Sequence, residues 1–364
     1  MFIPKEAGVW NNLNTSMIFL PVSTEAIRQA AEILRNGGLV AFPTETVYGL
    51  GADAFNPQAL AKVFQAKERP SFDPLIIHIA SFETLEKTAN LSLLSEEKRE
   101  KLFLLAEKFW PGPLSVVLPK SEKIPGIATA GLPTAAIRWP DNESAQKLIS
   151  VFGGAVAAPS ANPFGSLSPT RAQHVRDKLG GKIDMILDGG PARIGLESTV
   201  LDITGESVKI LRPGGTPKEA IEELIGPVRD GSFANIDENA SPASPGQLKS
   251  HYAPKTPLFA LEKEEIIRLQ YEEKDVFLFF DGSTRANWLK NQSEWPPETA
   301  LIKVLSESGQ AIEAASRLFE ILHELDNLNS SENSIISRIF AQFAPSQGLG
   351  EAINDRLRRA SSFR

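Results

Sequence analysis

The stretch PTETVYGLGADAFNPQALAKVFQAKERP, from Pro43 to Pro70, decides the organisation of the first part of the chain. It follows the apolar run GLVAFP, which is typical of a strand, and its first residues form a polar turn flanked by glycine. Asn56 and Pro57 then begin a short helix, which cannot continue past Pro70. A buried core does not need so many polar side chains at one turn. The strand–turn–helix unit therefore favours a site for an anionic substrate.

Helices and short β-rich runs alternate on both sides of this stretch. Upstream, Ser23 can cap a helix that runs to Asn36 and that Gly37 ends. Downstream, the strand-like runs are PLIIHI, LSVVLP, TAAIRW, AVAAPS and IDMILD, and helices are expected near residues 96–109, near 143–151 and from Ser168 to Gly180. STVLDIT and SVKILR form a predicted hairpin, which requires antiparallel pairing. The sequence thus predicts an α/β fold with a mixed sheet.

The composition changes between Gly226 and Lys255, where proline, glycine, serine and asparagine interrupt any steady period. Such a segment is typical of a linker. After it, TPLFAL, DVFLFFDG and ALIKVLS are strand-like, with helical stretches at residues 310–325 and 348–360. We therefore predict a first domain over residues 1–225, a linker over 226–255 and a smaller α/β domain over 256–364.

The composition is that of an ordinary globular chain of 364 residues, with a net charge of −7 and no cysteine. The negative charge argues against general binding to nucleic acids or anionic membranes, so a polyanion is expected to meet a focused cluster of cations. The missing cysteines exclude disulfides and thiolate metal sites. The N-terminus has no signal-peptide pattern and no run approaches the roughly 18 apolar residues of a membrane helix, so we expect a cytoplasmic protein with no membrane partner.

Several common catalytic motifs are missing from the sequence. Neither G-x-x-x-x-G-K-[ST] nor G-x-G-x-x-G occurs, no G-x-S-x-G is present, and no His, Asp or Glu cluster has metal-ligand spacing. The polar candidates that remain are cationic and hydroxylic. Lys67 and Arg69 each resemble an ordinary surface charge when taken alone. Their position before a strand, on the side of the polar turn, suits an ammonium and a guanidinium that grip a triphosphate.

Other candidates are also weak one at a time. His78 lies in an apolar strand, where a buried imidazole with satisfied hydrogen bonds is the commoner finding. Ser160 and Asn162, in the PSAN loop, suit either ordinary turn chemistry or a phosphate or ribose contact. Thr134 and Arg138 lie four apart on one strand and hence on one face, where a buried arginine would clamp a carboxylate.

Taken together and in order, these motifs carry a specific resemblance. PTETVYGLG, K-x-R-P, PLIIH, GLPTAAIRWP, APSAN, SPT, LDGGP, G-x-EST and ILRPG resemble the YrdC-type catalytic domain. SPGQLKSHYAP and GLGEAINDRL resemble the linker and second domain of the long, two-domain form of the threonylcarbamoyl-AMP synthase family. The likeness extends from Ser23 over nearly the whole chain. It implies a twisted mixed sheet with flanking helices and a smaller, Rossmann-like C-terminal α/β domain.

The resemblance also implies a reaction. The family joins L-threonine, bicarbonate and ATP into threonylcarbamoyl-AMP and pyrophosphate, with Mg2+ held mainly through the ATP phosphates and no metal site on the protein. Other proteins, the tRNA threonylcarbamoyl transferases, then place the group on an adenosine next to the tRNA anticodon. A weak contact with tRNA is implied as well, and the linker is expected to act as a lid that the second domain steadies.

Site residues follow from the resemblance, position by position. The implied threonine contacts, with Arg138 on the carboxylate, are Thr46, His78, Arg138, Ala158 and Ser198. The implied ATP contacts are Arg69, Asp73, Thr134, Ser160, Ser168, Arg212 and Tyr252, the last folding back over the site from the linker. The implied catalytic residues are the K-x-R and S-x-N pairs Lys67, Arg69, Ser160 and Asn162. Asp73 stands where many relatives carry asparagine, and an acid there would repel a triphosphate unless it meets Mg2+ or a cation.

Two other functions compete with this interpretation. An RNA-binding module of the tRNA-modification machinery, without adenylate synthesis of its own, would use the same cations on a concave surface. The acidic total and the missing basic run count against it. A carbamoyl transferase that contains a YrdC-type domain would carry zinc-finger cysteines, and the sequence has none.

Overall fold

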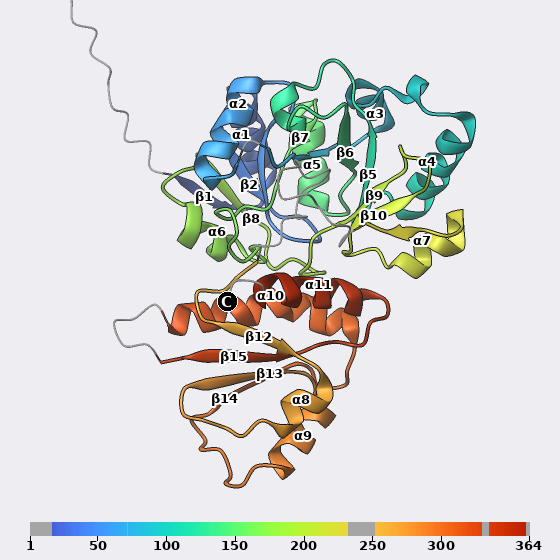
Figure 1. Cartoon of the computed structure of the whole chain (residues 1–364). Helices are drawn as coiled ribbons and strands as arrows, with labels where there is room; N and C mark the ends of the chain where they lie inside the picture. The colour runs from blue at the N-terminus through green and yellow to red at the C-terminus, as the bar shows by residue number, and fades with distance from the viewer. Residues whose placement is uncertain (1–16, 71, 232–251, 330–334, 362–364) are drawn as a thin grey trace, which may run out of the picture.

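The computed structural model describes residues 17–70, 72–231, 252–329 and 335–361, which form two sheets with their helices (Figure 1). The predicted α/β class with a mixed sheet is confirmed, because the first of these sheets contains parallel and antiparallel pairs. The predicted hairpin is also confirmed, since the strands at residues 199–202 and 209–212 pair antiparallel.

The large sheet contains eleven strands within the described chain. They are β1 (Ile18–Pro21), β2 (Val40–Phe42), β3 (Gly49–Asp53), β4 (Ile76–His78), β5 (Leu114–Pro119), β6 (Thr134–Arg138), β7 (Val156–Ala157), β8 (Met185–Asp188), β9 (Thr199–Asp202), β10 (Lys209–Arg212) and β11 (Arg229–Asp230). Their spatial order is β1-β8-β2-β3-β7-β4-β6-β5-β9-β10-β11. Strands distant in the sequence, such as β3 and β7, therefore become neighbours.

The small sheet is parallel throughout its described strands. They are β12 (Leu258–Leu261), β13 (Asp275–Asp281), β14 (Leu301–Ser306) and β15 (Arg338–Gln342), in the order β12-β15-β13-β14. Helices connect these strands, as parallel pairing requires. The second α/β unit expected after the linker is thus present, and we call the small sheet with α8 to α11 the small-sheet unit.

Helices cover both sheets. Those of the large sheet are α1 (Thr24–Arg35), α2 (Pro57–Lys67), α3 (Phe82–Thr88), α4 (Glu96–Phe109), α5 (Glu143–Phe152), α6 (Ala172–Leu179) and α7 (Lys218–Ile225). Those of the small sheet are α8 (Lys263–Arg268), α9 (Gly282–Lys290), α10 (Ala311–Leu328) and α11 (Leu349–Ser361). Among the described residues, no helix combines the length and the apolar character that a bilayer span requires.

The first helices begin where their capping residues predict. The Ser23 hydroxyl accepts a hydrogen bond from the backbone N–H of Ala26 at 3.1 Å, ahead of α1. The Asn56 side chain does the same for two N–H groups of α2. Helix α2 ends at Lys67, and the residue that caps it, Glu68, has a left-handed backbone with φ of 54°. That turn directs Arg69 back toward the large sheet.

Both faces of the large sheet are buried. Val40 and Phe42 belong to the apolar cluster that contains residues of α1 and α5, whereas Ala41, between them, belongs to the cluster that contains residues of α2 and α6. A sheet covered on two faces needs apolar side chains in both directions. This explains why its strands have nearly continuous apolar runs in the sequence, and it leaves the polar groups to gather at the strand ends.

One expectation about the decisive stretch was incomplete. The GLGAD segment after the polar turn is not only the flank of that turn but the strand β3, which pairs antiparallel with β2 and β7. Because glycine is uncommon inside strands, the sequence pattern did not predict this strand. The glycines are needed because a Cβ at Gly51 would lie 2.8 Å from the Phe42 ring and 2.9 Å from a methyl group of Val156.

A second expectation was wrong at one end of a helix. Helix α6 begins at Ala172 and not at Ser168, because the backbone before it is used elsewhere. The Pro169 carbonyl accepts from the Tyr48 N–H at 2.8 Å, and the Thr170 carbonyl accepts from the Ala192 N–H at 2.8 Å. The sequence patterns also did not identify β1, β11, β15, α3, α7, α8 and α9.

Helices α10 and α11 lie between the small sheet and the large-sheet unit (Figure 1). Leu167, Leu196 and Tyr252 pack into the same apolar cluster as the residues of α10 and α11. Gly195 comes so close to α10 that a Cβ atom there would lie 2.6 Å from the Ala315 carbonyl oxygen. The two units therefore meet through a close, apolar contact beside the G-x-E-S-T segment that begins at Gly195.

This contact predicts the effect of a methyl group at Gly195. Gly195→Ala and Gly153→Ala both place alanine in a left-handed backbone, with φ of 77° and 80°, but only the first meets α10. Left-handed strain should cost about 1–2 kcal/mol in each variant. Overpacking should lower the free energy of unfolding of Gly195→Ala by about 1–3 kcal/mol more. Urea denaturation measures both, and equal losses in the two variants would contradict the close contact.

Candidate active site

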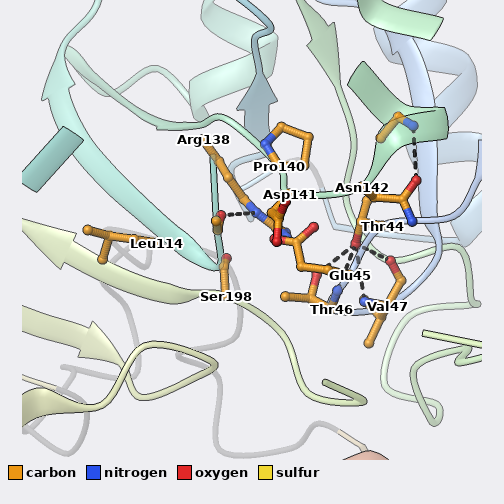
Figure 2. Close-up of polar contacts among 12 residues, drawn as sticks. Thr44, Glu45, Thr46, Val47, Leu114, Arg138, Pro140, Asp141, Asn142 and Ser198 are labelled. Atoms are coloured by element: carbon orange, nitrogen blue, oxygen red, sulfur yellow. Dashed lines mark hydrogen bonds and ion pairs between the residues drawn. The ribbon is translucent and has the colours of Figure 1, made fainter. Parts of the chain in front are cut away.

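The polar turn after β2 is built around Thr44. Its hydroxyl donates to the Val47 carbonyl at 2.6 Å and accepts from the N–H groups of Thr46 and Val47 (Figure 2). The Thr44 and Thr46 hydroxyls lie 2.8 Å apart. One hydroxyl thus satisfies the turn's backbone, which explains why threonine stands at this position. The same network holds the Thr46 side chain in the lining of a pocket.

Arg138 reaches the turn from the end of β6. Its Nη2 lies 2.5 Å from a carboxylate oxygen of Glu45, and its Nε donates to the Gly112 carbonyl at 3.2 Å (Figure 2). Both ionic side chains are buried, so the pair must form for either charge to be tolerated. The two contacts fix the plane of the guanidinium and leave its other N–H groups for a ligand.

His78 lies beside Arg138, because β4 and β6 pair in parallel with these two residues in register. Burial and the nearby Arg138 lower the pKa of His78 to about 3. The imidazole is therefore neutral at physiological pH. Its Nδ1 donates to the Ile76 carbonyl at 3.2 Å, which leaves Nε2 as an acceptor toward the pocket.

On one side of the pocket, Ser198 directly precedes β9 and contacts residues of β5 and β10. Its hydroxyl lies 2.8 Å from the Ser115 hydroxyl. Arg212, at the end of β10, donates from Nη2 to the Ser198 carbonyl at 2.9 Å and lies 3.2 Å from its hydroxyl. The arginine and the serine are both buried and both line the pocket. A cation and a hydroxyl are thus presented together to any ligand on this wall.

Arg69 meets a buried acid directly. Its Nη2 lies 2.8 Å from the Asp73 carboxylate, and its guanidinium also donates to the backbone carbonyls of Asp73 and Pro74. Burial raises the pKa of Asp73, and the charge of Arg69 opposes that rise. The repulsion expected between Asp73 and a triphosphate is thus countered by a neighbouring cation. Arg69 lines the pocket, whereas Asp73 lies behind it.

Lys67 does not point into the pocket. Its ammonium donates to the backbone carbonyls of Ser160 and Asn162, so it holds the PSAN loop from behind. Burial, helped by the charge of Arg69, keeps the pKa of Lys67 well below its usual range. The Asn162 side chain donates to the Ser166 carbonyl at 2.9 Å and shapes the same loop. The lysine and the asparagine therefore place Ser160, which does line the pocket.

The pocket brings together most of the residues that the sequence nominated. The nominated residues that line it are Thr46, Arg69, His78, Arg138, Ala158, Ser160, Ser198, Arg212 and Tyr252. The nominated residues outside its lining are Lys67, Asp73, Thr134, Asn162 and Ser168. Thr134 starts β6, and so lies at the far end of that strand from Arg138. His251, the neighbour of Tyr252 in the HYAP motif, lies outside the described residues.

Sequence reasoning missed two acids at this site. Glu45 anchors Arg138, and Glu197 lines the pocket, as Ser198 and Tyr252 do. Both stand inside motifs already singled out, T-E-T and G-x-E-S-T. The available signal was the rule that a buried arginine needs a partner, which asks for one carboxylate per inward arginine. The sequence alone does not say which carboxylate pairs with which arginine.

Comparison with known families places the chain from residue 32 to residue 362. Residues 32–214 match the Sua5/yciO/yrdC family, described as "Telomere recombination". Residues 216–362 match the family described as "Threonylcarbamoyl-AMP synthase, C-terminal domain". Together the two matches cover every described strand of both sheets except β1.

Individual relatives agree with the family matches. A threonylcarbamoyl-AMP synthase of Pyrococcus abyssi is 41% identical over 348 residues, 93% of this chain and 94% of that protein. One of Bacillus subtilis is 41% identical over 349 residues, 95% of each chain. The crystal structure of P. abyssi Sua5 complexed with L-threonine superimposes with a TM-score of 0.80 at 39% identity, covering 96% of this chain and 98% of the other.

The buried histidines predict how stability depends on pH. Burial, with Arg138 beside His78 and His174 beside His323, lowers the pKa of each of these two imidazoles to about 3. In the unfolded chain each would titrate near 6.5, so the unfolded state binds protons that the folded state refuses. The free energy of unfolding should stay constant above about pH 6.5 and fall toward about pH 4.5. Each histidine should contribute up to about 1.4 kcal/mol per pH unit to this fall.

Variants separate this effect from that of the carboxylates. His78→Gln and His323→Gln should each flatten the dependence of the free energy of unfolding on pH, and the double variant should flatten it further. Urea denaturation at a series of pH values measures the slope. An unchanged slope in His78→Gln would show that His78 is already protonated in the folded protein near pH 5.

Proposed function

The chain belongs to the threonylcarbamoyl-AMP synthase family, and we propose that its pocket joins L-threonine, bicarbonate and ATP into threonylcarbamoyl-AMP and pyrophosphate. The observation that carries the proposal is the convergence of two kinds of group in one pocket. Arg138, which suits a carboxylate, lines the pocket with several hydroxyls, and so do Arg69 and Arg212, which suit phosphates; we assign the first group to a threonine end and the second to a nucleotide end.

The threonine end is formed by Arg138 and its neighbours. The Arg138 guanidinium is fixed by Glu45 and Gly112, and its remaining donors suit the carboxylate of threonine. Thr46, neutral His78 and Ser198 offer hydrogen bonds to the amine and the hydroxyl of the substrate. The small side chain of Ala158 leaves room for the threonine methyl group.

The nucleotide end is formed by Arg69, Arg212, Ser160 and Tyr252. The two guanidiniums suit the phosphates, the Ser160 hydroxyl a phosphate oxygen, and the tyrosine a cover over the nucleotide. Lys67, Asn162, Asp73 and Ser168 act by holding these residues in place; for Thr134 the contact with ATP stays a prediction. Mg2+ enters as part of the MgATP substrate.

The chemistry requires positioning and charge neutralisation more than a reactive side chain. The threonine amine attacks the carbon derived from bicarbonate, water leaves, and a carbamate forms. A carbamate oxygen then attacks the α-phosphate, and pyrophosphate leaves with its electron pair. Arginines near the phosphates neutralise the charge of the transition state. Enclosure of the pocket limits hydrolysis of the mixed anhydride.

The wider context of the enzyme follows from the same proposal. We propose a division into a catalytic domain over residues 1–225, a linker and lid over 226–255 and a C-terminal domain over 256–364, with β11 adding the last strand of the large sheet. The product would pass, in the cytoplasm, to tRNA threonylcarbamoyl transferases, with at most a weak contact between this chain and tRNA. Most of the linker lies outside the described residues.

Pyrophosphate release tests the proposed reaction directly. The purified chain with MgATP should release pyrophosphate only when threonine and bicarbonate are both present. Release without either substrate would indicate a nucleotide hydrolase. Salt-sensitive tRNA binding without any release would favour an RNA-binding module.

Arg138 is expected to control the affinity for threonine. Arg138→Lys keeps a positive charge beside Glu45 but loses the planar fork, so the KM for threonine should rise by about tenfold, with little change in the KM for ATP. Arg193→Lys is the matched control, since Arg193 pairs with Asp141 at the exposed surface. An unchanged KM for threonine in Arg138→Lys would remove Arg138 from the threonine site.

A further inference from the structure

A carboxylate lines the end of the pocket that is suited to phosphates. Glu197 is buried and borders the pocket with Arg69, Arg212 and Tyr252. Arg356, Arg212 and the Ser168 hydroxyl outweigh burial and keep the pKa of Glu197 at about 2, so it is charged at physiological pH. An anion on the wall of a triphosphate site would repel the substrate unless it is neutralised.

The neutralising group comes from the small-sheet unit. Arg356, on α11, donates from Nε to a Glu197 carboxylate oxygen at 2.9 Å. The other Glu197 oxygen accepts from the Ser168 hydroxyl. Arg356 is 1% exposed, so this pair is as dry as a protein interior. An arginine far from the pocket in the sequence thus sets the charge of one pocket wall.

Arg356 also contacts two other parts of the same wall. Its Nη1 donates at 2.8 Å to the carbonyl of Pro213, the residue after Arg212. Its guanidinium carbon lies 5.1 Å from the centre of the Tyr252 ring. Three segments that border the nucleotide end therefore share one side chain.

The arginine is itself held from behind. Asp355 accepts from Arg356 Nη1 at 2.7 Å and from Arg359 Nε at 2.9 Å, and both of these partners lie on α11. The charges alternate from the helix toward the pocket in the order Arg359, Asp355, Arg356, Glu197. Each buried charge in this series has an opposite neighbour, as burial requires.

We propose that Arg356 is a positioning residue for the nucleotide end of the pocket, through which the small-sheet unit neutralises Glu197 and fixes the Pro213 and Tyr252 segments. The proposal rests on the adenylate synthesis proposed above. It assigns the small-sheet unit a direct part in ATP binding, in addition to any part in steadying the linker.

The inference predicts a separation of the two substrates. Arg356 and its contacts lie at the nucleotide end, whereas Arg138, His78 and Thr46 form the threonine end. Loss of Arg356 removes the cation that pairs with Glu197, so more of the negative charge of this carboxylate acts on the phosphates of ATP. The KM for ATP should therefore rise, while the KM for threonine should change little.

The test compares Arg356→Met with a double variant. In the full-length chain, Arg356→Met should raise the KM for ATP by at least about tenfold at saturating threonine. Glu197→Gln combined with Arg356→Met removes both charges and should recover most of that loss. Arg356→Lys keeps the positive charge but loses the planar guanidinium. Its KM for ATP should therefore lie between those of the wild type and Arg356→Met.

Arg171→Met is the matched control. Arg171 pairs with Glu320 of α10 across the same two units, but at the exposed surface and outside the pocket lining. It loses an arginine–glutamate pair of the same kind, so it should leave both KM values unchanged.

The outcomes distinguish the inference from the proposed function. A wild-type chain without threonine- and bicarbonate-dependent pyrophosphate release would overturn the proposed function first. With an active wild type, an unchanged KM for ATP in Arg356→Met, or no recovery in the double variant, would overturn the role of Arg356. If Arg356→Met does not fold, the double variant decides, because it removes both charges of the pair: a KM for ATP close to that of the wild type would support the proposal, and a rise of about tenfold would contradict it.

Discussion

The whole site depends on one constraint, that a buried arginine must have a carboxylate partner. Three pairs meet it around the pocket: Arg138 with Glu45, Arg69 with Asp73 and Arg356 with Glu197. Each side chain in these pairs is almost wholly buried. Leaving one partner out would strand a charge in a low-dielectric interior, at a cost of several kcal/mol. The cations that an anionic substrate needs can therefore be buried only together with acids that would otherwise repel it.

The pairs also connect the fold to the site. Glu45 lies in a turn and Arg138 at a strand end, and the strand order of the large sheet brings the two together. The pair of Arg69 and Asp73 forms just after α2, which ends in a left-handed turn. The third pair needs the small-sheet unit to dock. A tight fit beside Gly195 and a shared apolar cluster hold that docking. Packing between the two units thus determines whether the third pair forms.

The sequence allowed prediction of the features that depend on local chemistry. Capping by Ser23 and Asn56, the end of α2 before Pro70 and the hairpin follow from neighbouring residues, and the structure confirms them. Features that depend on distant contacts were not predictable. The glycines of β3 hide a strand because the close approach of Phe42 to Gly51 cannot be seen in one dimension. Lys67 was expected to face the phosphates, but two carbonyls of the PSAN loop hold its ammonium behind the wall.

The same reasoning explains why acids belong in a pocket for anions. A guanidinium has five N–H donors, and a carboxylate partner with one or two backbone carbonyls uses only some of them. The pairs keep the summed charge of these side chains small, so that they can be buried together. The partners fix the planes of Arg69 and Arg138, which line the pocket, and the proposed carboxylate and phosphate ligands would accept from their remaining donors. Orientation set in advance, more than net positive charge, is what this wall contributes to binding.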